Sequence, residues 1–172
     1  MSMEHIQAAI AKVTKHLAGH PQDALAQDAP ALAVLESGLR CRAHGPDGAS
    51  LVSDMPRSVG GGGDAPTPGW LMRAALANCD ATLVAMRAAQ LGIVLDKLEV
   101  SVASESDNRG VLGVDESVPA GPLSVRVSFR LAAPGIPAQQ LRELVHWAER
   151  HSPVGDALRR SLSVETEIHV ED

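Results

Sequence analysis

The feature that most constrains the fold of this chain is a long apolar segment, residues 68–91, between Thr67 and Gly92. Threonine is a good helix N-cap, and proline at position 68 suits the first helical turn because the N–H that it lacks would be unpaired there. One band of the predicted helix contains Leu71, Ala75, Asn78, Cys79, Thr82, Ala85, Met86 and Ala89, and another contains Leu76 and Leu83. A helix that is apolar on much of its circumference is buried, so we expect this one at the centre of the fold.

The composition indicates what surrounds that helix. The chain has 172 residues, of which 45% are hydrophobic but only 2% aromatic, so the core is expected to consist mainly of Ala, Leu and Val. A chain of this length buries about 70% of its unfolded surface. It therefore needs neither a disulfide framework nor a structural metal to be stable.

The charge excludes two classes of partner. The net charge is −6, whereas a protein that binds nucleic acid or an anionic membrane needs a basic face. Scarce aromatic residues also argue against a base-stacking groove. The sequence has neither an apolar run of about 18 residues nor a signal peptide's apolar region, so we expect a cytoplasmic protein without membrane contact.

The periodicity divides the chain into an extension and one domain. Ile6, Ile10, Val13 and Leu17 predict an amphipathic helix within residues 1–20, and the proline-containing residues 21–31 resemble a linker. We assign residues 1–31 to an N-terminal helical extension and linker, because so short a helix cannot bury its own apolar face, and residues 32–172 to the domain.

Alternating residues predict the strands of that domain. Strands are expected at 32–35, 38–43 and 49–53, with a hairpin turn at 45–48, then at 97–104, 123–131 and 164–170, and a second amphipathic helix at 138–150. The segment 105–122 is polar and contains Gly and Pro. The order β-β-α-β-β-α-β with one-sided strands predicts an α+β fold, an antiparallel sheet covered by helices.

Two conspicuous patterns have simple interpretations. The glycines at 60–63 lack the Lys-Ser/Thr of a P-loop and the flanking elements of a dinucleotide site, so they predict a flexible loop. The seven histidines show no metal-binding spacing, so we expect no metal.

The two cysteines are the candidate reactive groups. Arg40 and Arg42 flank Cys41, but on an alternating strand both arginines lie on the face opposite Cys41, which favours a small buried residue there. Cys79 lies in the middle of the long helix, far from its N-terminus and beside Asp80. Nothing nearby in the sequence activates it, so activation must come from elsewhere in the fold.

Three motifs resemble the OsmC family of osmotically inducible and organic hydroperoxide resistance proteins. The first runs from Pro66-Thr67-Pro68 to Ala77-Asn78-Cys79 and resembles the helix that carries the family's reactive cysteine. The second, His151-Ser152-Pro153-Val154, resembles a helix that ends in Cys-Pro-Val. The third, Met55-Pro56-Arg57-Ser58-Val59-Gly60-Gly61, resembles the segment before the first motif.

The resemblance implies antiparallel sheets packed around two long central helices in an intertwined homodimer, with its sites between the subunits. It implies reduction of hydrophobic organic peroxides by Cys79, with Arg40 or Arg42 as the charge partner. It also implies substrate contacts at Ser152, Gly69 and Met72, no cofactor, and regeneration by an external thiol reductant.

The departures from the family pattern leave alternatives open. Ser152 occupies the position of the resolving cysteine, and Gly69 that of a glutamate. A one-cysteine peroxidase based on Cys79 is our first hypothesis, with Cys41 as a substitute resolving cysteine left open. A non-catalytic protein that binds an apolar small molecule at the dimer interface is the second, and a Cys79–His151 thiol hydrolase is the third.

Overall fold

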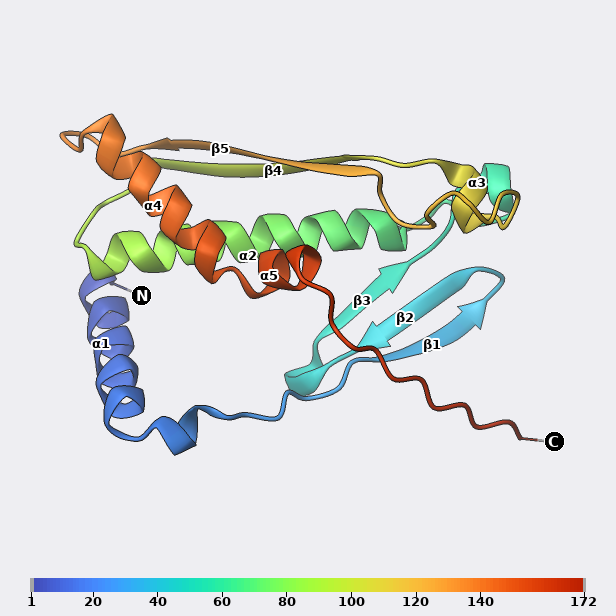
Figure 1. Ribbon diagram of the computed structural model, residues 1–172, viewed down its shortest axis with the longest axis horizontal. Coiled ribbons are helices and arrows are strands. Elements are labelled where there is room, and N and C mark those ends of the chain that lie inside the picture. The colour runs from blue at the N-terminus through green and yellow to red at the C-terminus, as the bar shows by residue number, and fades with distance from the viewer. Residues whose placement is uncertain (1, 172) are drawn as a thin grey trace.

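In the computed structural model, which describes residues 2–171, helix α2 (Pro68–Gln90) lies at the centre of the fold (Figure 1). Its start is the predicted one: Thr67 is the N-cap, and its Oγ1 accepts a hydrogen bond of 3.2 Å from the backbone N–H of Trp70. The helix ends before Gly92, whose φ of +67° is a left-handed conformation that glycine adopts without strain.

A long antiparallel hairpin and two helices pack on α2. Strands β4 (Lys97–Glu105) and β5 (Ser124–Ala132) pair without a break from Lys97↔Ala132 to Glu105↔Ser124. Helix α4 (Ala138–His151) crosses α2, and the short α5 (Pro153–Arg159), which the periodicity did not predict, follows it (Figure 1). The predicted strands at 97–104 and 123–131 and the helix at 138–150 are thereby confirmed.

The core lies where α2, α4 and the ends of the hairpin meet. Its fully buried apolar residues are Leu76, Val84, Ala88, Ala89, Ile93, Ala133, Leu144 and Ala148. All of these except Ile93 are Ala, Leu or Val, as the composition predicts. Small side chains allow the helices to approach closely, and none of these buried residues is aromatic.

Residues 32–53 form a second, three-stranded antiparallel sheet in the order β1 (Leu32–Ser37), β2 (Arg40–His44) and β3 (Ser50–Ser53). The side chains that share one face are Ala33, Leu35, Cys41, Ala43, Leu51 and Ser53. No described helix packs extensively on this sheet, and Leu35 and Leu51 are 63% and 49% exposed. An isolated sheet with an uncovered apolar face is not stable in water, so this face needs a partner.

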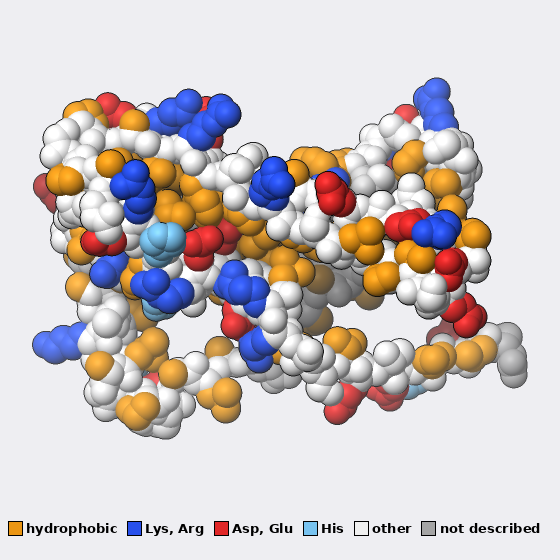
Figure 2. Space-filling model, turned by 45° about the horizontal axis from the view of Figure 1, so that its top comes forward, with side chains coloured by type: hydrophobic (Ala, Val, Ile, Leu, Met, Phe, Trp, Pro, Cys, Tyr) orange, Lys and Arg blue, Asp and Glu red, His pale blue; other side chains and the backbone are white. Residues whose placement is uncertain are grey.

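The molecule as a whole is open. Its accessible surface is 12629 Å², whereas a compact chain of 18.0 kDa is expected to expose about 8,000 Å². Figure 2 shows the cause: open space separates an upper body from a lower arm, and apolar side chains are exposed on both. The excess surface is of the size that obligate subunit interfaces cover.

The N-terminal segment forms the predicted helix. Helix α1 (Met3–Gly19) begins at the N-cap Ser2 and contacts the end of α2, where the Gln7 side chain donates a hydrogen bond to the Gln90 carbonyl. A short 3-10 turn, η1 (Pro21–Ala24), and an extended stretch lead to β1. Among residues 2–171, none of the helices combines the length and hydrophobicity that crossing a membrane requires.

Two predictions are wrong for the described chain: the strand at 164–170 and the burial of α2 on much of its circumference. Residues 164–170 pair with no strand of the described chain, and Val164 and Ile168 are 85% and 78% exposed. Helix α2 buries Leu76, Asp80, Val84 and Ala88 at four-residue spacing, together with Ala89 at its end. In its other band Ala75, Asn78, Thr82 and Ala85 are exposed and Leu71, Cys79 and Met86 are half-buried, because the β4–β5 hairpin and α4 cover one side of the helix.

The glycine run at 60–63 has a defined conformation that a flexible loop would lack. The carboxylate of Asp54, itself 2% exposed, accepts hydrogen bonds from the backbone N–H groups of Met55, Gly62 and Asp64. Burial opposes ionisation of this carboxyl group, but these donors outweigh it and hold the pKa of Asp54 below its ordinary value. The glycine run therefore wraps around the carboxylate of Asp54, an anion of the protein itself.

Replacing Gly61 by alanine is expected to destabilise the fold by roughly 3 kcal/mol, because its Cβ would lie 1.9 Å from the backbone oxygen of Met55. Backbone atoms cannot move aside as a flexible side chain can. The measurement is the free energy of unfolding in urea. The control is Gly121→Ala, where no atom lies within 4 Å of the new Cβ; equal unfolding free energies for the two variants would contradict the prediction.

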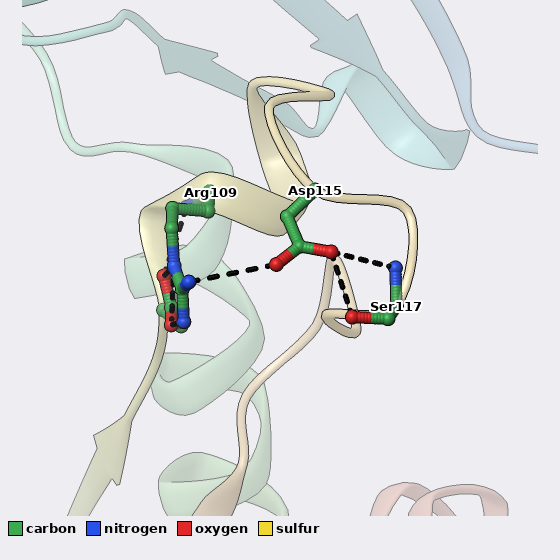
Figure 3. Close-up of polar contacts among 4 residues, drawn as sticks. Arg109, Asp115 and Ser117 are labelled. Carbon is green, nitrogen blue, oxygen red and sulfur yellow. Dashed lines mark hydrogen bonds and ion pairs between the residues drawn. The ribbon is translucent and has the colours of Figure 1, made fainter.

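The connection between β4 and β5 is also folded. It contains the single-turn α3 (Asn108–Val111), capped by Asp107. Figure 3 shows Arg109 beside Asp115, which also accepts hydrogen bonds from the backbone and hydroxyl of Ser117. The hydrogen bonds from Arg109 hold the pKa of Asp107 below its ordinary value. This segment, expected as a polar excursion, is thus a loop tied by its own ion pairs.

Candidate functional site

The structure brings Cys79 of α2 into contact with Ser152, the residue between α4 and α5. The Ser152 Oγ lies 3.2 Å from the Cys79 Sγ and donates a hydrogen bond to it. The two residues are 73 positions apart in the chain, and the packing of α4 and α5 on α2 is what joins them. Cys79 is half-buried and Ser152 is fully buried.

The orientation of the Ser152 hydroxyl follows from its place in the fold. Ser152 is the N-cap of α5, and its Oγ accepts a hydrogen bond of 3.1 Å from the backbone N–H of Gly155. This leaves the hydroxyl proton free to point toward the sulfur of Cys79. A donor at this position stabilises negative charge on the sulfur.

The predicted charge partners, Arg40 and Arg42, both bind Glu36. The Nε of Arg40 lies 3.0 Å from Glu36 Oε2, and the Nε of Arg42 contacts Oε1. The register between β1 and β2 shifts between Leu35 and Ser37, so Glu36 is an extra, unpaired residue of β1. The hydrogen bond from Arg42, supplemented by that from Arg40, holds the pKa of Glu36 below its ordinary value against the opposing effect of desolvation.

Within residues 2–171, no arginine donates a hydrogen bond to the Cys79 sulfur. Arg40 and Arg42 belong to the three-stranded sheet, apart from α2 (Figure 1). Cys41 lies on that sheet opposite Leu35 and Ser53, and both it and Cys79 are free thiols. A single chain therefore assembles Cys79 with Ser152 but leaves the arginines elsewhere.

The two remaining predicted contacts, Gly69 and Met72, lie in the first two turns of α2. Met72 is seven residues before Cys79, which places it on the same helix face about 10 Å away along the axis. Gly69 is exposed, and a Cβ there would come no closer than 3.9 Å to any neighbour, the Arg73 guanidinium being nearest. Both residues lie toward the N-terminal end of the helix that carries the thiol.

The structure does not support a Cys79–His151 pair. The Nδ1 of His151 lies 2.7 Å from the backbone oxygen of Trp147, and its ring stacks on the Trp147 indole with centroids 4.0 Å apart. No hydrogen bond joins His151 to Cys79 in the described part of the chain. Nor do three or more His, Cys, Asp or Glu side chains gather there into a group that could hold a metal ion.

Sequence reasoning missed two acidic residues. Glu36 was overlooked because the irregular pairing that aims it at both arginines is invisible in an alternating pattern. Asp80, which the sequence shows only as a neighbour of Cys79, is 3% exposed and lies between α2 and β5. A charged residue on an apolar helix face was the available signal for Asp80.

Comparisons with known proteins agree with this architecture. The family model described as OsmC-like protein matches residues 61–167. None of the curated proteins compared with the chain matches it. An organic hydroperoxide resistance protein OsmC from Legionella pneumophila is 22% identical, with a TM-score of 0.57, over 78% of this chain and 91% of that one. An OsmC-like protein from Mycoplasma pneumoniae is 15% identical, with a TM-score of 0.65, over 78% and 89%.

A third solved structure contains a bound small molecule. It is a putative organic hydroperoxide resistance protein from Vibrio cholerae with captopril in one of its active sites. That protein is 22% identical, with a TM-score of 0.51, over 78% of this chain and 88% of that one. At these identities the solved structures show a shared fold.

Proposed function

Because this chain belongs to the OsmC-like protein family, we propose that it reduces organic hydroperoxides with Cys79 as its single reacting cysteine. The observation that carries the proposal is the contact of 3.2 Å between Cys79 and Ser152. It supports the alignment of Ser152 with the family's second cysteine, because that alignment requires the two side chains to touch.

The chemistry that we propose is a thiol peroxidase cycle. The Cys79 thiolate attacks one oxygen of the O–O bond, the bond breaks, and the other oxygen leaves with its electron pair as an alkoxide that takes up a proton. The cysteine becomes sulfenic acid. One external thiol then displaces water to form a mixed disulfide, and a second thiol releases Cys79 and leaves as the oxidised disulfide, so that each hydroperoxide consumes two thiols.

In this proposal the positive charge that stabilises the Cys79 thiolate comes from an arginine of the three-stranded sheet. Arg40 and Arg42 do not reach Cys79 within one chain, so we assign the delivery of an arginine to a second copy. Glu36 orients both guanidinium groups and takes the place of the carboxylate that is lost at Gly69. Met72, on the same face of α2 as Cys79, contributes an apolar contact for the hydroperoxide near Gly69, whereas Ser152 contributes a contact beside Cys79.

The test is hydroperoxide consumption by the purified chain. Cumene or tert-butyl hydroperoxide is supplied with dithiothreitol or a dihydrolipoyl donor, and the remaining peroxide is measured over time. We expect consumption of many equivalents per chain, together with the mass of one added oxygen on Cys79 when the reductant is omitted. Consumption no faster than that by the reductant alone would refute the peroxidase proposal.

The homodimer is part of the same proposal. The apolar face of the three-stranded sheet and the uncovered band of α2 supply the surface, and the excess accessible area fits an obligate interface. Such an interface has twofold symmetry, so each apolar residue in it is buried twice. We propose that the second copy covers the face of the sheet that contains Leu35 and Leu51.

Replacing Leu51 by aspartate is therefore expected to dissociate the dimer. Removing two buried leucines from one symmetric interface weakens association by at least about 3 kcal/mol, or roughly a hundredfold. Light scattering after gel filtration should give twice the chain mass of 18.0 kDa for the wild type and a single chain mass for the variant. The control is Ser50→Asp, the adjacent residue of β3 on the opposite face of the sheet. A wild-type monomer, or a dimeric Leu51→Asp, would contradict the proposal.

One observation favours a second candidate function. The only hydrogen bond to the Cys79 sulfur among the described residues comes from a neutral hydroxyl, as expected for a non-catalytic protein that binds an apolar small molecule. The rate of alkylation of Cys79 as a function of pH separates the two candidates, because an activated cysteine reacts as a thiolate well below a pH of about 8.5, the ordinary pKa of a free thiol.

A further inference from the structure

Gly155 of α5 lies against two polar side chains, Ser152 and Arg159. A Cβ on Gly155 would be 3.0 Å from the Oγ of Ser152 and 3.1 Å from both Nη1 and Nη2 of Arg159. These atoms therefore surround one point, and at most about 6 Å separates the hydroxyl oxygen from the guanidinium nitrogens, a short distance for an electrostatic interaction. Because glycine has no Cβ, the side chain of Arg159 is able to approach Ser152 this closely.

A hydrogen bond holds the Arg159 guanidinium in this place. Its Nη2 donates to the backbone oxygen of Glu149, near the end of α4, so Arg159 bridges α5 and α4 across the segment that contains Ser152. The carbonyl acceptor is neutral, and none of the ion pairs among residues 2–171 includes Arg159. Its positive charge is therefore not neutralised by a carboxylate of the described chain.

The other charged groups around Arg159 leave its charge available. Two neighbouring carboxylates have basic partners of their own, in the pairs Glu149–His146 and Asp156–Arg160. Asp80 of α2 lines the same cavity as Arg159, but no hydrogen bond or ion pair in the described chain joins the two. The imidazole of His151 binds and stacks on Trp147. The half-buried residues of β4 and the β5 residues that line this cavity carry no charge.

We propose that Arg159 is a positioning residue for the reacting thiol and acts on it through Ser152. The Ser152 hydroxyl accepts a hydrogen bond from the Gly155 N–H and donates one to the Cys79 sulfur. The guanidinium lies on the Gly155 side of this hydroxyl, so its charge polarises the O–H bond toward the sulfur. Ser152 and Gly155 are buried, so water screens the charge little along this path.

The same chain thus stabilises negative charge on the Cys79 sulfur, in addition to the arginine that we assign to the second copy. The inference rests on the proposed role of Cys79 as the reacting cysteine. Its test uses alkylation, which requires no hydroperoxide. Failure of the test and failure of the peroxidase activity are therefore separate results.

The test is the rate at which iodoacetamide alkylates Cys79 as a function of pH, followed by mass spectrometry of the peptide that contains Cys79. Arg159→Gln removes the charge but keeps an N–H donor for the Glu149 carbonyl. We expect this variant to raise the midpoint pH of the rate by at least about half a unit, so that alkylation well below the midpoint is about threefold slower. Arg159→Lys keeps the charge and should restore at least half of the shift.

The matched control is Arg142→Gln, which changes the net charge equally at an exposed arginine of α4. It should leave the midpoint pH unchanged. An unchanged midpoint in Arg159→Gln, an equal shift in Arg142→Gln, or a midpoint of Arg159→Lys equal to that of Arg159→Gln would each overturn the proposal.

A second measurement needs only the wild-type chain. The ¹⁵Nε resonance of Arg159 in NMR spectra should shift with pH at the same midpoint as the alkylation of Cys79, because the interaction of two charges affects both groups. The resonance of Arg142 should show no shift at that pH. An Arg159 resonance that does not follow Cys79 would refute the proposal even where Arg159→Gln fails to fold.

Discussion

Replacing Cys79 by serine is expected to lower the rate of hydroperoxide consumption at least about a thousandfold, to that of the reductant alone. A serine hydroxyl is not ionised near neutral pH, and its oxygen does not take up a second oxygen atom as sulfur does. The remaining thiol cannot substitute, because Cys41 lies on the three-stranded sheet opposite Leu35 and Ser53. The measurement is the initial rate with cumene hydroperoxide and dithiothreitol.

The matched control is Cys41→Ser, which also removes one thiol. We expect this variant to keep most of the wild-type rate, because the proposed cycle assigns no step to Cys41. Loss of activity in Cys41→Ser with retention in Cys79→Ser would show that Cys41 is the reacting cysteine and that our proposal is wrong. Equal and small losses in both variants would indicate that neither thiol reacts.

Replacing Ser152 by cysteine is expected to convert the chain into a protein that forms an internal disulfide. The wild-type oxygen lies 3.2 Å from the Cys79 sulfur, and an S–S bond of about 2.05 Å requires a further approach of only about 1 Å. After one equivalent of hydroperoxide, the sulfenic acid of Cys79 should condense with the thiol introduced by Ser152→Cys and release water. The thiol titre should then fall from three per chain to one, that of Cys41.

The disulfide also changes what excess peroxide does. The wild-type sulfenic acid has no nearby thiol, so excess hydroperoxide should oxidise it irreversibly to sulfinic acid. We expect Ser152→Cys to resist this inactivation at least about tenfold better, since condensation competes with the second oxidation. Mass spectrometry distinguishes a loss of two hydrogens from a gain of two oxygens.

Ser152→Ala is the control for this experiment. It removes the hydrogen bond to Cys79 and the N-cap of α5, at a cost of about 1 kcal/mol of stability. It should be overoxidised as readily as the wild type. Three free thiols in Ser152→Cys after peroxide treatment would contradict the contact on which the proposed function rests.

The elements with the strongest local signals were predicted correctly. Thr67 and Pro68 define the start of α2, and the alternation of Val125, Val127 and Phe129 defines β5, because capping and periodicity are properties of neighbouring residues. The strand expected at 164–170 was wrong for a related reason. Alternation indicates a segment that is able to pair, but pairing also needs a partner strand, and residues 164–170 pair with none in the described chain.

The candidate site was predicted in part. The motifs indicated Cys79 and Ser152 separately, and the structure brings their side chains into contact. Assignment of catalytic roles to Arg40 and Arg42 stays a prediction, since their partner in the chain is Glu36. The glycine run was misjudged because its ligand, the carboxylate of Asp54, precedes it by several residues and is brought close only by the loop itself.

The sequence by itself determined the secondary structure around the long central helix, the α+β class, the membership of a family and the replacement of a cysteine by Ser152. These depend on the order of residues along the chain. Only the tertiary structure decided that Ser152 donates a hydrogen bond to Cys79, that Glu36 holds both arginines, and that Asp80 is buried without a partner. Such contacts join side chains from different elements, and their geometry is set by how helices and strands pack rather than by spacing in the sequence.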